Sequence, residues 1–132
     1  MPDVLPADLI DLMHQASPCF ISTTMPDGSS QLTLTWVDTD GANVLINTVE
    51  GFQKVKNVRR DPRVAVAVSD PSNPSHYHSV RGTVIDISAE GAREHIEELA
   101  QRYLGAPYPW YGGRDQTRLI LTIEPQSVHS VG

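Results

Sequence analysis

The chain has 132 residues, one cysteine and a formal net charge of −6 at pH 7. This length suits one domain with its own core, so residues 1–132 are expected to form a single domain. An acidic chain lacks the broad basic surface that nucleic-acid binding needs, and its apolar runs are far shorter than the roughly 20 residues that cross a bilayer. Neither nucleic acid nor membrane is therefore an expected partner. The N-terminal sequence carries acids where a secretory signal carries basic residues, which indicates a cytoplasmic protein.

The first predicted element is a helix over residues 6–15, because apolar side chains recur there at helical spacing. From residue 18 onward the pattern changes to a period of two, which is typical of strands. Three strands are predicted, over residues 18–24, 30–37 and 42–49. Turn-forming residues at 26–28 and 38–41 separate them, so this part is expected to be a meander of hairpins.

Residues 53–60 suit a short helix or turn, which Asp61 and Pro62 end because the residue before a proline avoids helical geometry. Residues 63–69 are almost uniformly apolar, which predicts a strand buried on both faces, as in a closed barrel. A long strand over 76–87 follows, and Gly82 within it predicts a bulge or a tight bend.

Residues 89–104 form the strongest predicted helix, with Ser88 as its expected cap and Gly105 at its end. A last strand over 117–123 and a short tail complete the chain. Six strands with flanking helices give an α+β, mainly β fold, namely a small six-stranded barrel.

Histidine and cysteine offer few catalytic or metal-binding patterns. His76 and His78 would place two imidazoles on one face of a strand, but no carboxylate or cysteine stands near them at ligand spacing, so no metal site is expected. Cys19 lies in an apolar strand without a neighbouring cation and is expected to be an inert buried thiol. Glycine-rich phosphate loops and a GxSxG elbow are missing from the sequence.

The positive charge is concentrated in one segment. Five of the ten basic residues lie within ten positions: Lys54, Lys56, Arg59, Arg60 and Arg63. Two interpretations stay open at this point, a local anion site and a solvated basic turn. The strand end at Asn47 and Thr48 adds amide and hydroxyl groups, and with the following cations these are the groups that bind a phosphate.

The stretch from Trp36 to Val84 resembles the split-barrel superfamily of pyridoxamine phosphate oxidase-like flavoproteins, most closely its actinobacterial branch that uses the deazaflavin coenzyme F420. The resemblance covers about residues 8–128. Its most specific parts are Lys54 with Asn57, the RRDPRV run at 59–64, Gly82, and RYLG at 102–105. The chain departs from the oxidases at its C-terminal sequence, IEPQSVHSVG, where they carry an Arg-Leu-x-Pro type motif, so oxidation of vitamin B6 is not expected.

The resemblance implies a six-stranded split barrel, a homodimer, and cofactor sites in grooves between the subunits. The cofactor-binding residues that it implies are Gln31, Leu32, Thr33, Asn47, Thr48, Lys54, Asn57 and Arg60. Candidates for the substrate side are Trp36, Tyr77, His78, Tyr108 and Tyr111, for each of which ordinary packing or surface exposure is the alternative. Phe52 stands where many relatives have a basic residue, so that phosphate contact is expected to be either missing or supplied by Lys56.

The implied activity is an F420-dependent reductase that transfers hydride to a small unsaturated substrate, with the chemistry carried by the cofactor. Two alternatives remain: an FMN-dependent reductase or oxidase, and a protein that binds a flavin, deazaflavin or haem without turnover. The same barrel fold hosts both enzymes and binding proteins. The extra arginines of the basic segment are expected to hold the anionic tail of F420, which FMN lacks.

Overall fold

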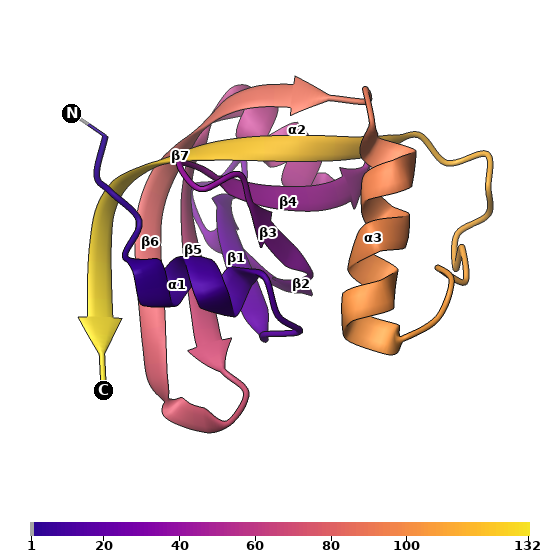
Figure 1. Ribbon diagram of the computed structural model, residues 1–132. Helices are drawn as coiled ribbons and strands as arrows, with labels where there is room; N and C mark the ends of the chain where they lie inside the picture. Colours follow the sequence, from indigo (N-terminus) through magenta and orange to yellow (C-terminus); the bar gives the residue numbers. More distant parts are fainter. Residues whose placement is uncertain (1) are drawn as a thin grey trace.

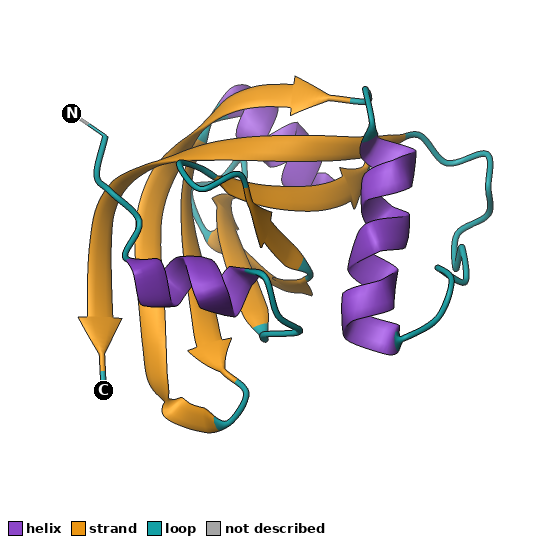
Figure 2. Ribbon diagram, viewed as in Figure 1, coloured by secondary structure: helices purple, strands orange, loops and turns teal. Residues whose placement is uncertain are grey.

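A computed structural model describes residues 2–132 as one curled antiparallel sheet with three helices (Figures 1 and 2). The elements in chain order are α1 (Ala7–Met13), β1 (Cys19–Thr24), β2 (Ser30–Thr35), β3 (Val37–Thr39), β4 (Val44–Val49), α2 (Gln53–Arg60), β5 (Arg63–Asp70), β6 (Asn73–Ser88), α3 (Ala92–Leu104) and β7 (Arg118–Val131). The mainly β, α+β class is as predicted. Within residues 2–132, no helix is both long and apolar enough to cross a membrane.

The sheet has seven strands in the order β2-β1-β5-β6-β7-β4-β3. Its two edge strands, β2 and β3, are consecutive in the chain and are separated by Trp36 alone. One residue can join opposite edges only if the sheet curls until the edges meet, and Figure 1 shows this curl. The prediction of one strand over 30–37 was therefore wrong, and the break at Trp36 turns the expected six strands into seven.

The core lies inside the curl. Inward side chains of the strands pack there against Leu9, Leu12 and Met13 of α1, which crosses the open side of the sheet in Figure 1. In β5, Val64, Val66 and Val68 are buried, whereas the alternate positions from Arg63 onward face outward. The expectation that this strand is buried on both faces is thus not met within one chain, because nothing in residues 2–132 covers the outer face.

The longest hairpin joins β6 and β7, and both strands exceed their predicted lengths. The predicted tail after residue 123 is instead strand to Val131. Pro125 is tolerated because it pairs with Gly82 at a register shift. The predicted bulge at Gly82 is confirmed, and a Cβ there would lie 2.6 Å from the carbonyl oxygen of Glu124.

Helix α3 begins at Ala92, three residues later than predicted, with Gly91 in left-handed geometry as its N-cap. The Ser88 hydroxyl instead accepts a hydrogen bond from the Glu90 amide. The helix ends at Gly105 as predicted, again in left-handed geometry. It stands at one side of the sheet in Figure 1 and carries a second apolar cluster, in which Trp36 and Tyr103 pack.

Candidate anion and cofactor site

Two adjoining cavities lie between the sheet and the loop that follows α3. They share four lining residues: Asn47, Tyr108, Tyr111 and Arg118. The smaller, of about 270 Å³, continues to Leu34, Thr35 and Trp36. The larger, of about 440 Å³, continues to Thr48, Phe52 and Lys54. Because the lining is shared, the two form one elongated site with an aromatic end and a cationic end.

Two cations define the cationic end. Arg118, the first residue of β7, is 7% exposed, and Lys54 lies half-buried in the first turn of α2. Within residues 2–132 no carboxylate lies at salt-bridge distance from either one. Burial lowers the pKa of Lys54, with repulsion from Arg118 as the second cause, and burial also lowers the pKa of Arg118. Two neighbouring cations without a counter-ion are a candidate anion site.

The same end holds a buried hydroxyl without a partner. Thr48 is 2% exposed, and its Oγ1 has no hydrogen-bond partner within the described residues. A buried polar atom that is left unpaired is costly, and it usually has a ligand or water as its partner. Thr48 lines the larger cavity, so an anion held by Lys54 and Arg118 would supply an acceptor for this hydroxyl.

A buried polar network fixes the position of Arg118. Its Nε donates to Oδ1 of Asn47 at 2.9 Å, and Nη1 donates to the Tyr108 hydroxyl at 3.3 Å. The Asn47 amide donates in turn to the carbonyl of Ala92 at 2.9 Å and to Nδ1 of His95 at 3.1 Å. Both donors of the predicted residue Asn47 are therefore used within the chain, and this side chain positions the guanidinium.

The network continues beneath the site to an ion pair. Nε2 of His95 donates to Oδ2 of Asp38 at 2.9 Å, and Arg102 donates to Oδ1 of the same carboxylate at 2.9 Å. Burial raises the pKa of Asp38, but the hydrogen bonds from His95 and Arg102 outweigh it and bring the value to about 2. Asp38 was predicted to lie in a turn, yet it is a buried residue of β3.

Aromatic side chains form the other end of the site. Trp36 stacks on Tyr103 with ring centroids 5.0 Å apart, and Tyr108 meets Trp36 edge to face at 6.0 Å. Tyr108 is buried, whereas Tyr111 is 75% exposed at the rim. Three predicted substrate-side residues, Trp36, Tyr108 and Tyr111, thus meet at one cavity. Trp36 packs on the apolar cluster of α3 and also lines the cavity. Packing and a place on the substrate side are therefore compatible for this residue.

Three of the predicted cofactor-binding residues form a separate cluster that holds α2 on the sheet. Asn57 is fully buried and donates to Thr23 at 3.0 Å and to the Gln31 side chain at 3.3 Å. Arg60 donates to the Thr24 carbonyl and to Oδ1 of Asn57. Gln31, Asn57 and Arg60 do not line either cavity.

Leu32 and Thr33 lie on opposite faces of β2, as neighbours in a strand must. Leu32 points outward and is 65% exposed, whereas Oγ1 of Thr33 is buried without a partner among the described residues. Neither residue lines the two cavities. Contact of either with a cofactor stays a prediction.

The basic segment contributes less free charge than expected. Arg59 pairs with Glu50, and Arg63 pairs with Asp61, so these two arginines brace the ends of α2. Lys56 is exposed and does not line the cavities, so it does not replace the cation missing at Phe52. Arg118, which the sequence analysis missed, supplies the second cation. Its one sequence feature is a basic residue at the start of an apolar strand.

Tyr77 and His78 lie on β6 and do not line either cavity. The expectation that no carboxylate accompanies the histidine pair was wrong, because Asp8 of α1 lies within hydrogen-bonding distance of both His76 and His78. This carboxylate is 68 residues away from His76 in the chain, so spacing in the sequence could not reveal it.

Comparison with known proteins places this chain in a family. The model of the family described as Pyridoxamine 5'-phosphate oxidase matches residues 5–132, so the chain belongs to that family. Its fold is that of the split-barrel, flavin- and deazaflavin-related oxidoreductases. Among curated proteins no match was found.

Several solved structures are similar to this chain. An F420 reductase is 28% identical over 95% of this chain and 98% of its own, with a TM-score of 0.82. A conserved hypothetical protein from Mycobacterium tuberculosis is 25% identical over 98% of this chain and 86% of its own, with a TM-score of 0.76. General stress protein 26 from Bacillus anthracis, at 15% identity over 92% and 88% and a TM-score of 0.68, shares the fold.

Proposed function

We propose that this protein is an F420-dependent reductase that binds the cofactor in the elongated site and transfers hydride to a small unsaturated substrate. The observation that carries the proposal is the pair of cations without counter-ions, Lys54 and Arg118, at one end of a site whose other end is aromatic. The likeness to an F420 reductase along 98% of that chain supports the choice of cofactor.

The residues fit a phosphate-bearing cofactor. Lys54 and Arg118 would donate charge-assisted hydrogen bonds to the phosphate, and Thr48 would donate from its buried hydroxyl. Asn47 holds Arg118 in place, so that the guanidinium does not have to be ordered on binding. When bound, the deazaflavin supplies the hydride chemistry.

At the aromatic end, Trp36 and Tyr108 would exclude water from the reacting region. Tyr108 accepts a hydrogen bond from Arg118 and therefore keeps its own O–H for donation to a bound molecule. This makes Tyr108 the described residue best placed to donate a proton, with Tyr111 at the rim as the second candidate.

A homodimer is part of the proposal. The outer face of β1 and β2 carries exposed Phe20, Leu32 and Leu34, beside Ala65 and Ala67 of β5. Leu34 also lines the aromatic cavity, so the apolar face runs into the open edge of the cofactor site. A second copy on this face would bury the leucines and close the site.

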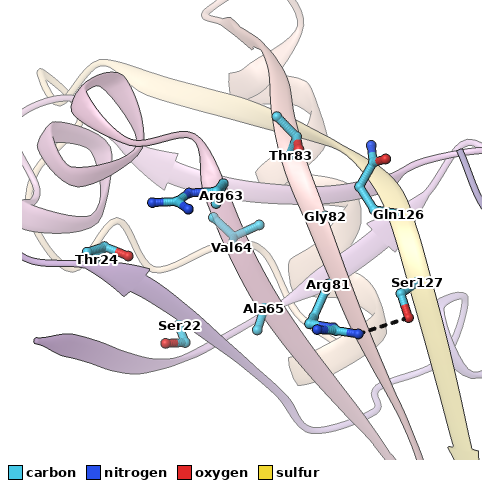
Figure 3. Close-up of a pocket in the computed structure, with 10 residues that line it drawn as sticks. All are labelled: Ser22, Thr24, Arg63, Val64, Ala65, Arg81, Gly82, Thr83, Gln126 and Ser127. Atoms are coloured by element: carbon cyan, nitrogen blue, oxygen red, sulfur yellow. Dashed lines mark hydrogen bonds between the residues drawn. The ribbon is translucent and has the colours of Figure 1, made fainter. Parts of the chain in front are cut away.

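The same outer face is hollowed where it crosses β1, β5, β6 and β7. Figure 3 shows this cavity of about 500 Å³, in which Arg81 donates to the Ser127 hydroxyl at 3.4 Å. Its lining includes short side chains, such as Ser22 and Ala65, together with the long side chains of Arg63 and Arg81. A hollow of this size would accept side chains of a second copy.

FMN is the second candidate, and one observation favours it. Because Arg59 and Arg63 are paired within the chain, the free cations suffice for one phosphate and do not require a longer anionic tail. The experiment is a parallel titration of the purified protein with F420 and FMN at low and moderate salt. Tighter binding of F420, followed by turnover of its reduced form, is the expected result. Tighter FMN binding would overturn the assignment, and binding of either without turnover would make the protein a carrier.

A further inference from the structure

A cluster of two imidazoles and one carboxylate lies away from the cofactor cavities. Nε2 of His76 and Nε2 of His78, both on β6, lie 2.5 Å and 2.8 Å from the same oxygen, Oδ2 of Asp8 on α1. All three potential ligand atoms lie within 4.8 Å of one another. None of these residues lines either cofactor cavity.

The far sides of both rings are held by strand β7. Nδ1 of His76 lies 2.9 Å from the carbonyl oxygen of Val131, and Nδ1 of His78 lies 2.8 Å from the hydroxyl of Ser130. A carbonyl can only accept, so His76 carries a proton on Nδ1 and directs Nε2 toward Asp8. Metal-binding histidines are held in this way, with the second ring nitrogen donating to a backbone or side-chain oxygen.

The convergence on one oxygen calls for a proton or a metal ion at each Nε2. A neutral imidazole that is protonated on Nδ1 presents a lone pair at Nε2, and that lone pair repels a carboxylate oxygen at hydrogen-bonding distance. Without a metal, His76 would therefore need a proton on both ring nitrogens, whereas His78 can donate from Nε2 as a neutral ring whose Nδ1 accepts from the Ser130 hydroxyl. One divalent cation would satisfy all three atoms at once.

We propose that Asp8, His76 and His78 bind a divalent cation of the zinc class through Oδ2 and the two Nε2 atoms. Two imidazoles and one carboxylate suit Zn²⁺ with bonds of roughly 2.0–2.2 Å, and solvent completes a tetrahedral shell at the fourth position. The ligand atoms must separate to roughly 3.3 Å from each other in such a shell. The Asp8 side chain can move by this amount, because it is 56% exposed on α1, a helix that is buried along one face only.

The bound ion would join α1, β6 and, through the second ring nitrogens, β7. This cross-link ties the N-terminal helix to the end of the longest hairpin, so the ion is expected to stabilise the fold. The site does not depend on the proposed reductase function, and the two proposals can fail separately.

The test uses the full chain without a histidine tag, stripped with a chelator, and titrated with ZnCl₂ by calorimetry. One equivalent per chain is expected, together with a rise of several degrees in the melting temperature. Titration with Co²⁺ should give the visible absorption of a tetrahedral nitrogen and oxygen shell. Asp8→Asn and His78→Gln should each weaken zinc binding at least 10-fold, whereas His129→Gln, on an exposed histidine of β7, should not.

Asp8→Asn keeps the size of an exposed side chain, so folding of this variant is expected and circular dichroism would verify it. Absence of a zinc isotherm for the native chain would overturn the proposal. Equal affinities of the native chain, Asp8→Asn and His129→Gln would do the same, since zinc would then bind elsewhere. In either case Asp8, His76 and His78 would form a hydrogen-bonded cluster that holds protons instead of a metal ion.

Discussion

Nε2 of His95 lies 2.9 Å from Oδ2 of Asp38, and this bond joins α3 to β3 beneath the proposed cofactor site. The other oxygen of the carboxylate accepts from Arg102, which lies about two helical turns after His95 on α3. Asp38 therefore holds α3 in place. Helix α3 bears His95 and the carbonyl of Ala92, both of which accept from Asn47. Asn47 in turn holds Arg118.

Asp38→Asn is expected to lower stability above pH 4 and to flatten the acid unfolding profile. Because the folded pKa of Asp38 is about 2 against an ordinary 3.8, its carboxylate stabilises the fold above pH 4 and loses this contribution as the pH falls toward 2. The shift corresponds to about 2 kcal/mol at neutral pH. Urea unfolding between pH 2 and pH 7 measures it.

Asp61→Asn serves as the control for that series. Its pKa is also about 2, through hydrogen bonds to Arg63, but that arginine is 82% exposed. Solvent screens such a pair, so the change in stability should be much smaller. Equal pH profiles for the two variants would mean that the Asp38 network does not hold α3.

Lys54→Met is expected to stabilise the protein without ligand and to weaken anion binding. A half-buried ammonium without a counter-ion costs stability, and methionine fills similar space without charge. The gain should be about 1 kcal/mol, while the loss of a charge-assisted hydrogen bond should weaken phosphate-bearing cofactors by about 1.5–3 kcal/mol. Thermal unfolding with and without inorganic phosphate, together with FMN and F420 titrations, measures both effects.

Lys56→Met is the matched control, because Lys56 lies on the same helix but is exposed and outside the cavity. It should change neither quantity by more than a few tenths of a kcal/mol. If both lysine variants bind the cofactors as the native chain does, the basic segment is a solvated turn.

Leu32→Lys is expected to shift a dimer toward monomers of 14.5 kDa. Leu32 lies on the outer apolar face but outside both cavities, and two lysines would enter each symmetric interface without partners. The dimer dissociation constant should rise by roughly 100-fold. Light scattering coupled to size exclusion measures it, with Val4→Lys, at a position 82% exposed, as control. A native chain that is monomeric and still binds cofactor would contradict the shared site.

Gly82→Ala is expected to lower the free energy of unfolding by about 1–3 kcal/mol, because a Cβ would lie 2.6 Å from a backbone oxygen and 2.7 Å from Cγ2 of Ile123. The crossing of β6 and β7 would have to widen. Ser79→Ala on the same strand should leave the unfolding midpoint nearly unchanged. A midpoint for Gly82→Ala equal to the native one would show that the hairpin adapts freely at its bulge.

The sequence by itself determined the mainly β class, the positions of most strands, a helix or turn over 53–60, and a bulge or bend at Gly82, because alternation, turn residues and glycine act over a few neighbouring residues. Lys54 stood out in the basic segment, because a concentration of cations is visible in the sequence itself. The resemblance to the family, and not local side-chain chemistry, added Trp36 and Tyr108 to the candidates.

Only the tertiary structure decided which candidates meet. Gln31 and Asn57 are 26 positions apart yet bond to each other where α2 meets the sheet. Arg118 comes from a distant strand and completes the cation pair with Lys54. Asp8 reaches His76 across 68 positions in the same way. Such convergence depends on the curl of the sheet and the order of its strands, which are set by the packing of the whole core and leave no trace in the spacing of residues along the chain.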